Sequence, residues 1–233
     1  IAGVSGASTA VSVELTKNAA ELGADAVMAM PPNGAAGQVV WDHYVAIAET
    51  GQLPVWIQNN KPPAGPVVPT NMMVKMLNEV EHVDYVKEES HLPGQIMTEL
   101  LEKAGGAVKG LMGGMGGRYL VDEYRRGSAG TMPAGHITDA HVKLWNALDA
   151  GGRDSEGLQI VTDEARTLWE RMIPSLNFEF MFGANAYKAA YFRRGIIKTD
   201  LTRNPANKYL DKLDYEELDT ILDRMGDLLS WKK

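Results

Sequence analysis

The stretch VDYVKEESHLPGQIMTELLEKAGGAVKGLM, residues 83–112, predicts the fold class. It opens with a short run rich in Val and Tyr, continues with an amphipathic helical pattern at 94–103, and ends in a second apolar run at 107–112. A strand, a helix and a strand in this order form a βαβ unit, in which the two strands lie parallel. The stretch therefore predicts a parallel sheet covered by helices.

The same order recurs on both sides of this stretch. Strands are predicted at 1–5, 26–30, 55–58, 83–88, 107–112 and 130–133, with helices at 10–22, 39–49, 71–80, 94–103 and 118–126. Beyond residue 138 only helices are predicted, at 139–150, 156–172, 179–194 and 215–231. We predict an α/β protein with six βα units at 1–137 and a C-terminal helical extension at 138–233 that packs on them.

Six βα units fit either an open doubly wound sheet or part of a (β/α)8 TIM barrel. The first turn between strand and helix, at 3–8, lacks the glycine spacing of a dinucleotide-binding loop. The next strand ends in Met30-Pro31 and not in the acidic residue that would hold a ribose. The barrel is therefore the favoured fold, and its catalytic groups are expected at the C-terminal ends of the strands.

Composition excludes several classes of function. The chain has 233 residues, a formal net charge of -7, scattered basic residues and no cysteine, which argues against nucleic-acid binding and excludes thiolate sites. No apolar run approaches the roughly 18 residues that span a bilayer, and the N-terminus is unlike a signal peptide. We expect a cytoplasmic protein that binds a small molecule, neither nucleic acid nor membrane.

Lys87 is the foremost catalytic candidate among the strand ends. Strand alternation places Val83, Tyr85 and Lys87 on one face. If that face is the barrel interior, burial favours a neutral amine, which attacks carbonyl carbons to form imines. The alternative is a lysine that reaches water or pairs with Glu88 or with its neighbour at 89. A rival lysine at 109 comes early in its strand, which favours a structural role.

Other strand ends supply substrate-binding candidates. These are Gln58, Gly113, Gly114, Thr131 and Met132. The glycines at 113, 114, 116 and 117 permit close approach of a small ligand, or form a tight turn. The histidines at 43, 82, 91, 136 and 141 have no metal-ligand spacing and are expected at the surface. We predict neither a metal site nor a cofactor.

Five separated motifs carry a family resemblance. They are Ile1-Ala2-Gly3-Val4, AELGADAVMAMPP at 20–32, Leu53-Pro54-Val55, Val86-Lys87-Glu88 and Gly127-Ser128-Ala129-Gly130. In order and spacing the chain resembles the dihydrodipicolinate synthase/N-acetylneuraminate lyase family from its third barrel strand onward. The resemblance implies strands 3–8 of the barrel only, so we expect the first and last strands of this chain not to pair.

The resemblance also implies an activity. Members bind a 2-oxo acid as an imine on the lysine that corresponds to Lys87, and then make or break a C–C bond or dehydrate a deoxy sugar acid. It implies a lyase or aldolase that acts on pyruvate or a 2-keto-3-deoxy sugar acid and assembles as a homo-oligomer, such as the family's tetramer. The family's carboxylate-binding strand would precede this chain.

Departures from the family pattern reduce the number of family activities that we expect of this chain. Gln58 stands where synthases and lyases carry a proton-relaying tyrosine, and Pro63 stands where synthases carry a substrate-binding arginine. Pro32-Asn33 replaces a tyrosine pair. Because an amide cannot relay protons, we expect a dehydratase or aldolase with another proton shuttle, and not a true dihydrodipicolinate synthase. If Gln58→Tyr leaves the exchange of pyruvate methyl protons unchanged while Lys87 still forms the imine, Thr131 and His136 are the candidates for that shuttle. The alternative is a non-catalytic member that binds a 2-oxo acid or serves as an assembly subunit.

Overall fold

The computed structural model describes residues 1–203 and 209–230, and the chain divides into two compact units. The first unit comprises residues 1–114 and 126–130, and the second comprises 115–125 and 131–233. The domains predicted at 1–137 and 138–233 stay a prediction. Every helix in the described part of the chain is too short or too polar to cross a membrane.

Six strands form one sheet in the order β1-β2-β3-β4-β5-β6. They span Ala2–Gly3, Val27–Ala29, Val55–Asn59, Val83–Glu88, Gly110–Gly113 and Gly130–Thr131. Neighbours from β1 to β5 are parallel, and the Ala129 amide beside β6 donates to the Leu111 carbonyl of β5 at 2.8 Å. The α/β class and the partial (β/α) barrel are confirmed. Since β1 and β6 end this order, the predicted lack of pairing between them is confirmed for the described residues.

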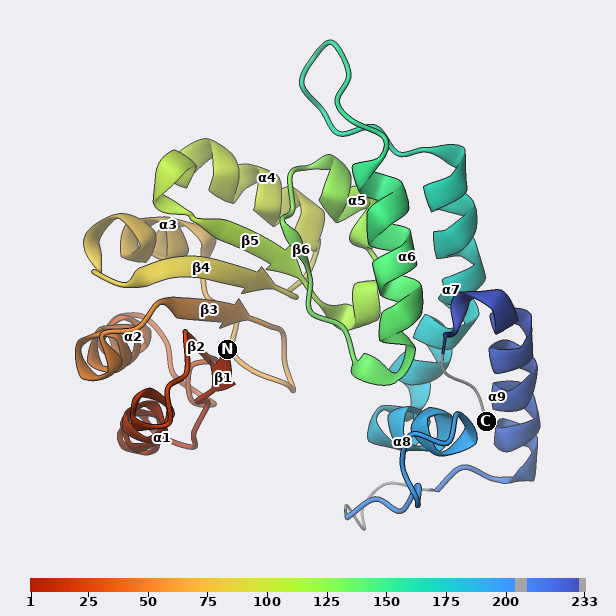
Figure 1. Cartoon of the computed structure of the whole chain (residues 1–233). Coiled ribbons are helices and arrows are strands. Elements are labelled where there is room, and N and C mark those ends of the chain that lie inside the picture. Colours follow the sequence, from red (N-terminus) through yellow and green to blue (C-terminus); the bar gives the residue numbers. More distant parts are fainter. Residues whose placement is uncertain (204–208, 231–233) are drawn as a thin grey trace. The chain divides into compact units, whose positions relative to one another are not determined.

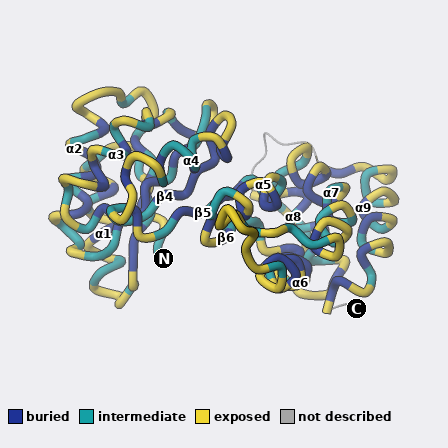
Figure 2. Tube along the Cα trace, turned by 90° about the horizontal axis from the view of Figure 1, so that it is seen from above, coloured by how far each residue is buried: buried dark blue, intermediate teal, exposed yellow. Residues whose placement is uncertain are grey.

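Helices alternate with strands in the first unit. They are α1 (Thr9–Glu21), α2 (Gln38–Gly51), α3 (Thr70–Glu79) and α4 (Pro93–Ala104), and they lie along one side of the sheet (Figure 1). Every second strand residue points toward them, so Ile57, Val86 and Leu111 pack in one buried cluster with helical residues such as Met76 and Leu100. Buried and exposed residues alternate along the helices (Figure 2), as expected for amphipathic elements.

A bulge in β4 corrects one prediction about its faces. Val83 pairs with Val55, but the next pair is Trp56 with Tyr85, so β4 carries one extra residue. Val83 therefore lies with Val55 in the core beneath the helices. Tyr85 and Lys87 share the opposite face, which the uninterrupted alternation had wrongly assigned to Val83 as well.

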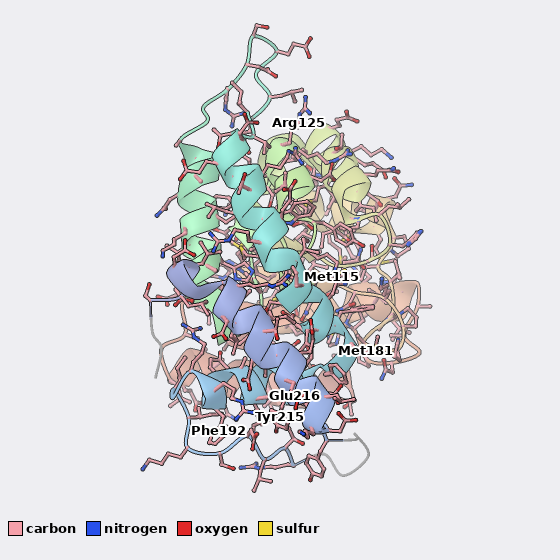
Figure 3. The ribbon with its side chains drawn as sticks, turned by 90° about the vertical axis from the view of Figure 1, so that its right-hand side faces the viewer. Met115, Arg125, Met181, Phe192, Tyr215 and Glu216 are labelled. Carbon is pink, nitrogen blue, oxygen red and sulfur yellow. The ribbon has the colours of Figure 1, made fainter. Side chains whose placement is uncertain are left out.

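The second unit is helical. It contains α5 (Leu120–Arg125), α6 (Thr138–Asp149), α7 (Asp163–Phe182), α8 (Ala184–Arg193) and α9 (Lys212–Arg224). Helices α7 and α9 lie side by side in Figure 3, where Met181 marks the end of α7 and Tyr215 lies on α9. The apolar faces of α6, α7 and α9 bury Leu144, Leu176 and Ile221 in a hydrophobic core that belongs to the second unit.

Several helix boundaries in the second unit differ from the prediction. The helix expected at 179–194 is α8, which begins at Ala184 because α7 extends to Phe182. The helix expected at 156–172 begins at Asp163, because the Thr162 hydroxyl caps it by accepting the Ala165 amide at 3.1 Å. It then continues through Pro174, whose exposed position lets the helix tolerate the missing donor, and ends at Gly183 with φ 54°.

The last predicted helix, 215–231, begins earlier. Asp211 and Asp214 form a capping box that starts α9 at Lys212. The helix ends at Arg224, and residue 231 lies outside the described residues.

Candidate active site

Lys87 lies near the C-terminal end of β4 on the sheet face opposite to the helices. It pairs with Gln58 of β3 and Met112 of β5. Two residues earlier, Tyr85 stacks on Trp56 with ring centroids 4.5 Å apart. Lys87 is only 9% exposed. The prediction that Lys87 is shielded from solvent and shares its face with Tyr85 is therefore confirmed.

The carboxylate of Glu89 contacts the Lys87 ammonium directly. Lys87 Nζ lies 3.0 Å from Glu89 Oε2. The same oxygen accepts hydrogen bonds from Gln58 Nε2 at 2.7 Å and from Asn60 Nδ2 at 3.4 Å. Gly114 faces this carboxylate so closely that any side chain there would collide with it. The arrangement brings an amine, an amide and an acid within the reach that proton transfer requires.

The Glu88 side chain points to the face of the sheet that the helices cover, where its hydrogen bonds stabilise the fold. It is fully buried; its Oε2 accepts Asn59 Nδ2 at 2.7 Å, and its Oε1 accepts the amide and hydroxyl of Ser90 at 2.7 and 2.5 Å. Burial raises the pKa of Glu88, against the lowering by these hydrogen bonds. Asn59 Oδ1 in turn accepts the Val68 amide at 2.8 Å, which ties the loop after β3 to the strand ends.

Lys109, the alternative candidate for the catalytic lysine, lies where a structural residue is expected. Lys109 directly precedes β5, and its side chain is 60% exposed. Its ammonium pairs with Asp84 at 2.8 Å, and this hydrogen bond raises the pKa of Lys109. A raised pKa keeps the amine protonated, which opposes attack on a carbonyl.

The remaining strand-end candidates lie in two different units. Gly113 ends β5 beside Glu88, and Gly114 follows it in the first unit. Thr131 ends β6 and Met132 follows, both half-buried and both in the second unit. The Thr131 hydroxyl is buried and has no hydrogen-bond partner among the described residues. Their roles in substrate binding stay predictions.

The prediction of surface histidines is wrong for three of the five. His43, His136 and His141 are 0%, 2% and 6% exposed. Each ring packs in the interior because a polar partner accompanies it, as Thr9 Oγ1 does at 3.0 Å from His43 Nδ1. Burial lowers the pKa of all three and that of His136 to about 3, so His136 is neutral at physiological pH.

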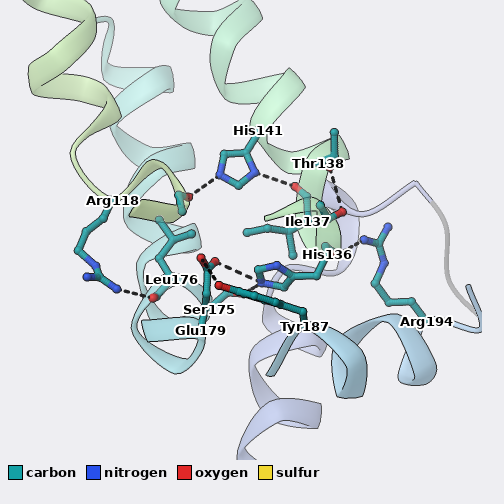
Figure 4. A network of polar contacts seen from close by, with 12 residues as sticks. Arg118, His136, Ile137, Thr138, His141, Ser175, Leu176, Glu179, Tyr187 and Arg194 are labelled. Atoms are coloured by element: carbon teal, nitrogen blue, oxygen red, sulfur yellow. Dashed lines mark hydrogen bonds and ion pairs between the residues drawn. The ribbon is translucent and has the colours of Figure 1, made fainter. Parts of the chain in front are cut away.

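Two of these histidines belong to a polar network in the second unit (Figure 4). His136 Nε2 lies 3.2 Å from Ser175 Oγ and 3.8 Å from Glu179 Oε2, and the Tyr187 hydroxyl donates to Glu179 Oε1 at 3.3 Å. His141 places its ring nitrogens 2.8 and 3.1 Å from two backbone carbonyls. No group of three or more metal-binding side chains is found among the described residues.

Glu89 is the site residue that the sequence interpretation gave only as a pairing partner. Its spacing of two from Lys87 would place both side chains on one face if the strand continued, and this spacing could have indicated the contact. Its amide does continue the ladder, because it donates to the Asn59 carbonyl at 2.8 Å.

The Dihydrodipicolinate synthetase family profile matches residues 1–130, more than half of the chain. The chain belongs to the dihydrodipicolinate synthetase family. Lys87, its partner at 89 and the strands that carry them all fall within the matched region.

Two curated relatives differ in how much of this chain they match. An L-2-keto-3-deoxyarabonate dehydratase from Azospirillum brasilense is 26% identical over 204 residues, 85% of this chain and 63% of its own. A 4-hydroxy-tetrahydrodipicolinate synthase from Chlorobium limicola is 34% identical over 94 residues, 40% of this chain and 31% of its own. The chain thus spans less than two thirds of the length of either.

Solved structures of the dihydrodipicolinate synthetase family share the fold. A Pseudomonas aeruginosa protein assigned as a dihydrodipicolinate synthetase superposes with a TM-score of 0.83 and 27% identity, over 96% of this chain and 74% of its own. A dihydrodipicolinate synthase from Rhodopseudomonas palustris gives 0.81 at 22% identity, over 95% and 73%.

Proposed function

We propose that this chain carries the imine-forming centre of a lyase that removes water from a 2-keto-3-deoxy sugar acid. Family membership and the similarity to a dehydratase along 85% of the chain support a lyase of this kind. The observation that carries the proposal is the buried contact of 3.0 Å between the Lys87 ammonium and the Glu89 carboxylate. It pairs the nucleophile of the family's chemistry with a proton acceptor.

The proposed reaction begins at Lys87. Its ammonium gives a proton to water, and the neutral amine adds to the C2 carbonyl of the 2-oxo acid to form a carbinolamine. The carbinolamine hydroxyl then takes a proton from solvent and leaves as water, which forms a protonated imine. The imine draws electrons from C3, so the C3 proton passes to the Glu89 carboxylate and an enamine forms. The enamine then expels the C4 hydroxyl, which takes the proton back from Glu89 and departs as water. Hydrolysis of the imine frees the lysine.

Gln58 has a positioning role in this scheme. Its amide donates to Glu89 Oε2 at 2.7 Å and thereby fixes the carboxylate beside the lysine. Glu89 replaces Thr131 and His136 as the favoured proton shuttle, since it contacts Lys87 directly, whereas the His136 ring is buried beside Ser175 in the second unit. An aldolase would use the same imine but break the C3–C4 bond.

Reductive trapping tests the lysine. With pyruvate or the sugar acid present, borohydride reduces an imine to a stable amine, and mass spectrometry of the digest locates the adduct. We expect the adduct on Lys87, its loss in Lys87→Arg and its retention in Lys109→Arg. An unmodified protein would favour the non-catalytic alternative, and an adduct on Lys109 would overturn the assignment.

Product analysis then separates the two lyase reactions. Dehydration of a five-carbon 2-keto-3-deoxy acid keeps all five carbons in one product, whereas aldol cleavage releases pyruvate. We expect no pyruvate. We also propose a homo-oligomeric, cytoplasmic protein whose only substrate partner is the 2-oxo acid, and light scattering after size exclusion measures the first of these properties.

A further inference from the structure

The second unit carries a groove that the proposed reaction does not use. Its volume is about 290 Å³, and it lies between α5 and the N-terminal half of α7. The lining residues are Arg118, Tyr119, Val121, Asp122, Arg125, Val161, Arg166 and Trp169. None of them belongs to the cluster around Lys87.

The groove is positive on a chain that is negative as a whole. Three arginines and one aspartate line it, against a formal net charge of -7 for the protein. Arg166 is exposed on α7 with acidic residues three before and four after it, at 163 and 170, yet no ion pair joins it to either among the described residues. Arg125 likewise has no ion pair in the described part of the chain (it is labelled in Figure 3). Both guanidinium groups are free to bind an added anion.

The third arginine is held in place. Arg118 Nη2 donates to the Leu176 carbonyl at 2.7 Å (Figure 4), and its guanidinium lies 4.2 Å from the centroid of the Phe180 ring. Its Nε is buried and has no hydrogen-bond partner among the described residues. A guanidinium that is already fixed contributes its positive charge to the groove without a further loss of side-chain entropy.

Apolar surface completes the lining. The Trp169 indole N–H donates to the Arg118 carbonyl at 3.2 Å, so this ring has only its carbon surface to offer a ligand. Tyr119 is 42% exposed, and Val121 and Val161 supply aliphatic walls. Guanidinium forks bind carboxylates and phosphates in bidentate geometry, and aromatic walls bind flat rings.

We propose that this groove is a second binding site, for a small molecule in which an oxyanion, either carboxylate or phosphate, is attached to a flat ring. The oxyanion lies between Arg125 and Arg166, and the ring lies on Trp169. A volume near 290 Å³ suits a ligand of one or two rings. The site is independent of the imine chemistry, because it shares no residue with it.

Nuclear magnetic resonance on the uniformly 15N-labelled protein tests the site. The probes are phenyl phosphate, benzoate, inorganic phosphate and the neutral benzyl alcohol, and the reporter is the Trp169 indole N–H, assigned by its loss in Trp169→Phe. We expect a saturable shift with phenyl phosphate or benzoate at a Kd of about 1 mM, the affinity ordinary for so few atoms. Which of the two binds more tightly identifies the oxyanion.

Matched variants locate the binding. Arg125→Gln and Arg166→Gln are each expected to weaken the Kd about tenfold or more. Lys212→Gln, which removes one exposed positive charge outside the groove, is expected to leave the Kd unchanged within about twofold. The rest of the spectrum reports whether each variant is folded. A missing shift, or binding by both arginine variants as tight as that of the unsubstituted protein, overturns the site. Binding of inorganic phosphate or benzyl alcohol as tight as that of phenyl phosphate and benzoate overturns the proposed ligand class.

Discussion

Replacing Glu89 by glutamine removes the proposed proton acceptor and keeps its shape. Glutamine retains one oxygen that accepts from Lys87 or Gln58, which now lie 3.0 and 2.7 Å from Oε2, but it cannot take up a proton. General acid–base catalysis contributes about 10²–10⁴-fold, or about 2.7–5.4 kcal/mol at 1.36 kcal/mol per decade. We expect kcat of Glu89→Gln to fall by about that factor, while Lys87 still forms the imine.

Stability has to be measured beside activity, because the ion pair is buried. The side chains of Lys87 and Glu89 are 11% and 9% exposed, and removing one partner from a buried pair costs about 3–5 kcal/mol. A glutamine keeps the hydrogen bonds, so the loss for Glu89→Gln should fall at or below the lower end of that range. Urea unfolding followed by circular dichroism gives this number. Glu99→Gln, on the partly exposed face of α4, is the matched control and should change stability by less than about 0.5 kcal/mol.

Two assays on the folded variant then decide the role of Glu89. Borohydride trapping measures imine formation, and release of the dehydrated product measures turnover. Turnover within about tenfold of the unmodified protein would refute the reasoning, because it lies below the smallest expected contribution. Loss of trapping together with turnover would instead assign Glu89 to imine formation and not to the later proton transfer.

Three further predictions concern the two cores. Asn59→Ala removes a buried hydrogen bond to Glu88 and one from a loop amide, so the free energy of unfolding in urea should fall by about 2–4 kcal/mol, whereas the exposed Asn78→Ala should change it by less than about 0.5 kcal/mol. Burial lowers the pKa of His136 from 6.5 to about 3, so between pH 3 and 6.5 the unfolded chain binds more protons than the folded one. The free energy of unfolding therefore rises with pH in this range, by up to about 1.4 kcal/mol per pH unit. His136→Gln should reduce this slope, and an unchanged slope would contradict the burial of His136. Leu144→Ala leaves a cavity in the fully buried core of the second unit and should cost about 2–5 kcal/mol in the same unfolding assay, and a smaller loss would mean that the core collapses around it.

The sequence predicted the order of strands and helices because that order depends on local periodicity. All six strands and the first five helices lie within a few residues of their expected positions. The misplaced elements depend on single contacts with no periodic pattern. The Thr162 cap starts α7 seven residues later than predicted, and the bulge in β4 moves Val83 to the helix side. A bulge adds one residue without changing composition, so alternation alone misses it.

The candidate site was predicted only in part, for a related reason. The placement of Lys87 followed from alternation near the end of its strand, but burial of His43, His136 and His141 depends on partners distant in sequence. Thr9 lies 34 residues from His43, and Ser175 lies 39 residues from His136. Such contacts between distant residues cannot be predicted from residue type and spacing, so the histidines were assigned to the surface on their polarity alone.

The two adjacent glutamates explain how one strand end serves both the fold and the proposed chemistry. Glu88 turns toward the helices, where Asn59 and Ser90 satisfy its oxygens and burial raises its pKa. Glu89 turns to the face of Lys87 and accepts its ammonium at 3.0 Å. Alternation along the strand forces these opposite directions, so neither carboxylate can take the place of the other. A single pair of identical residues therefore anchors the loop on one side of the sheet and supplies the proposed proton acceptor on the other.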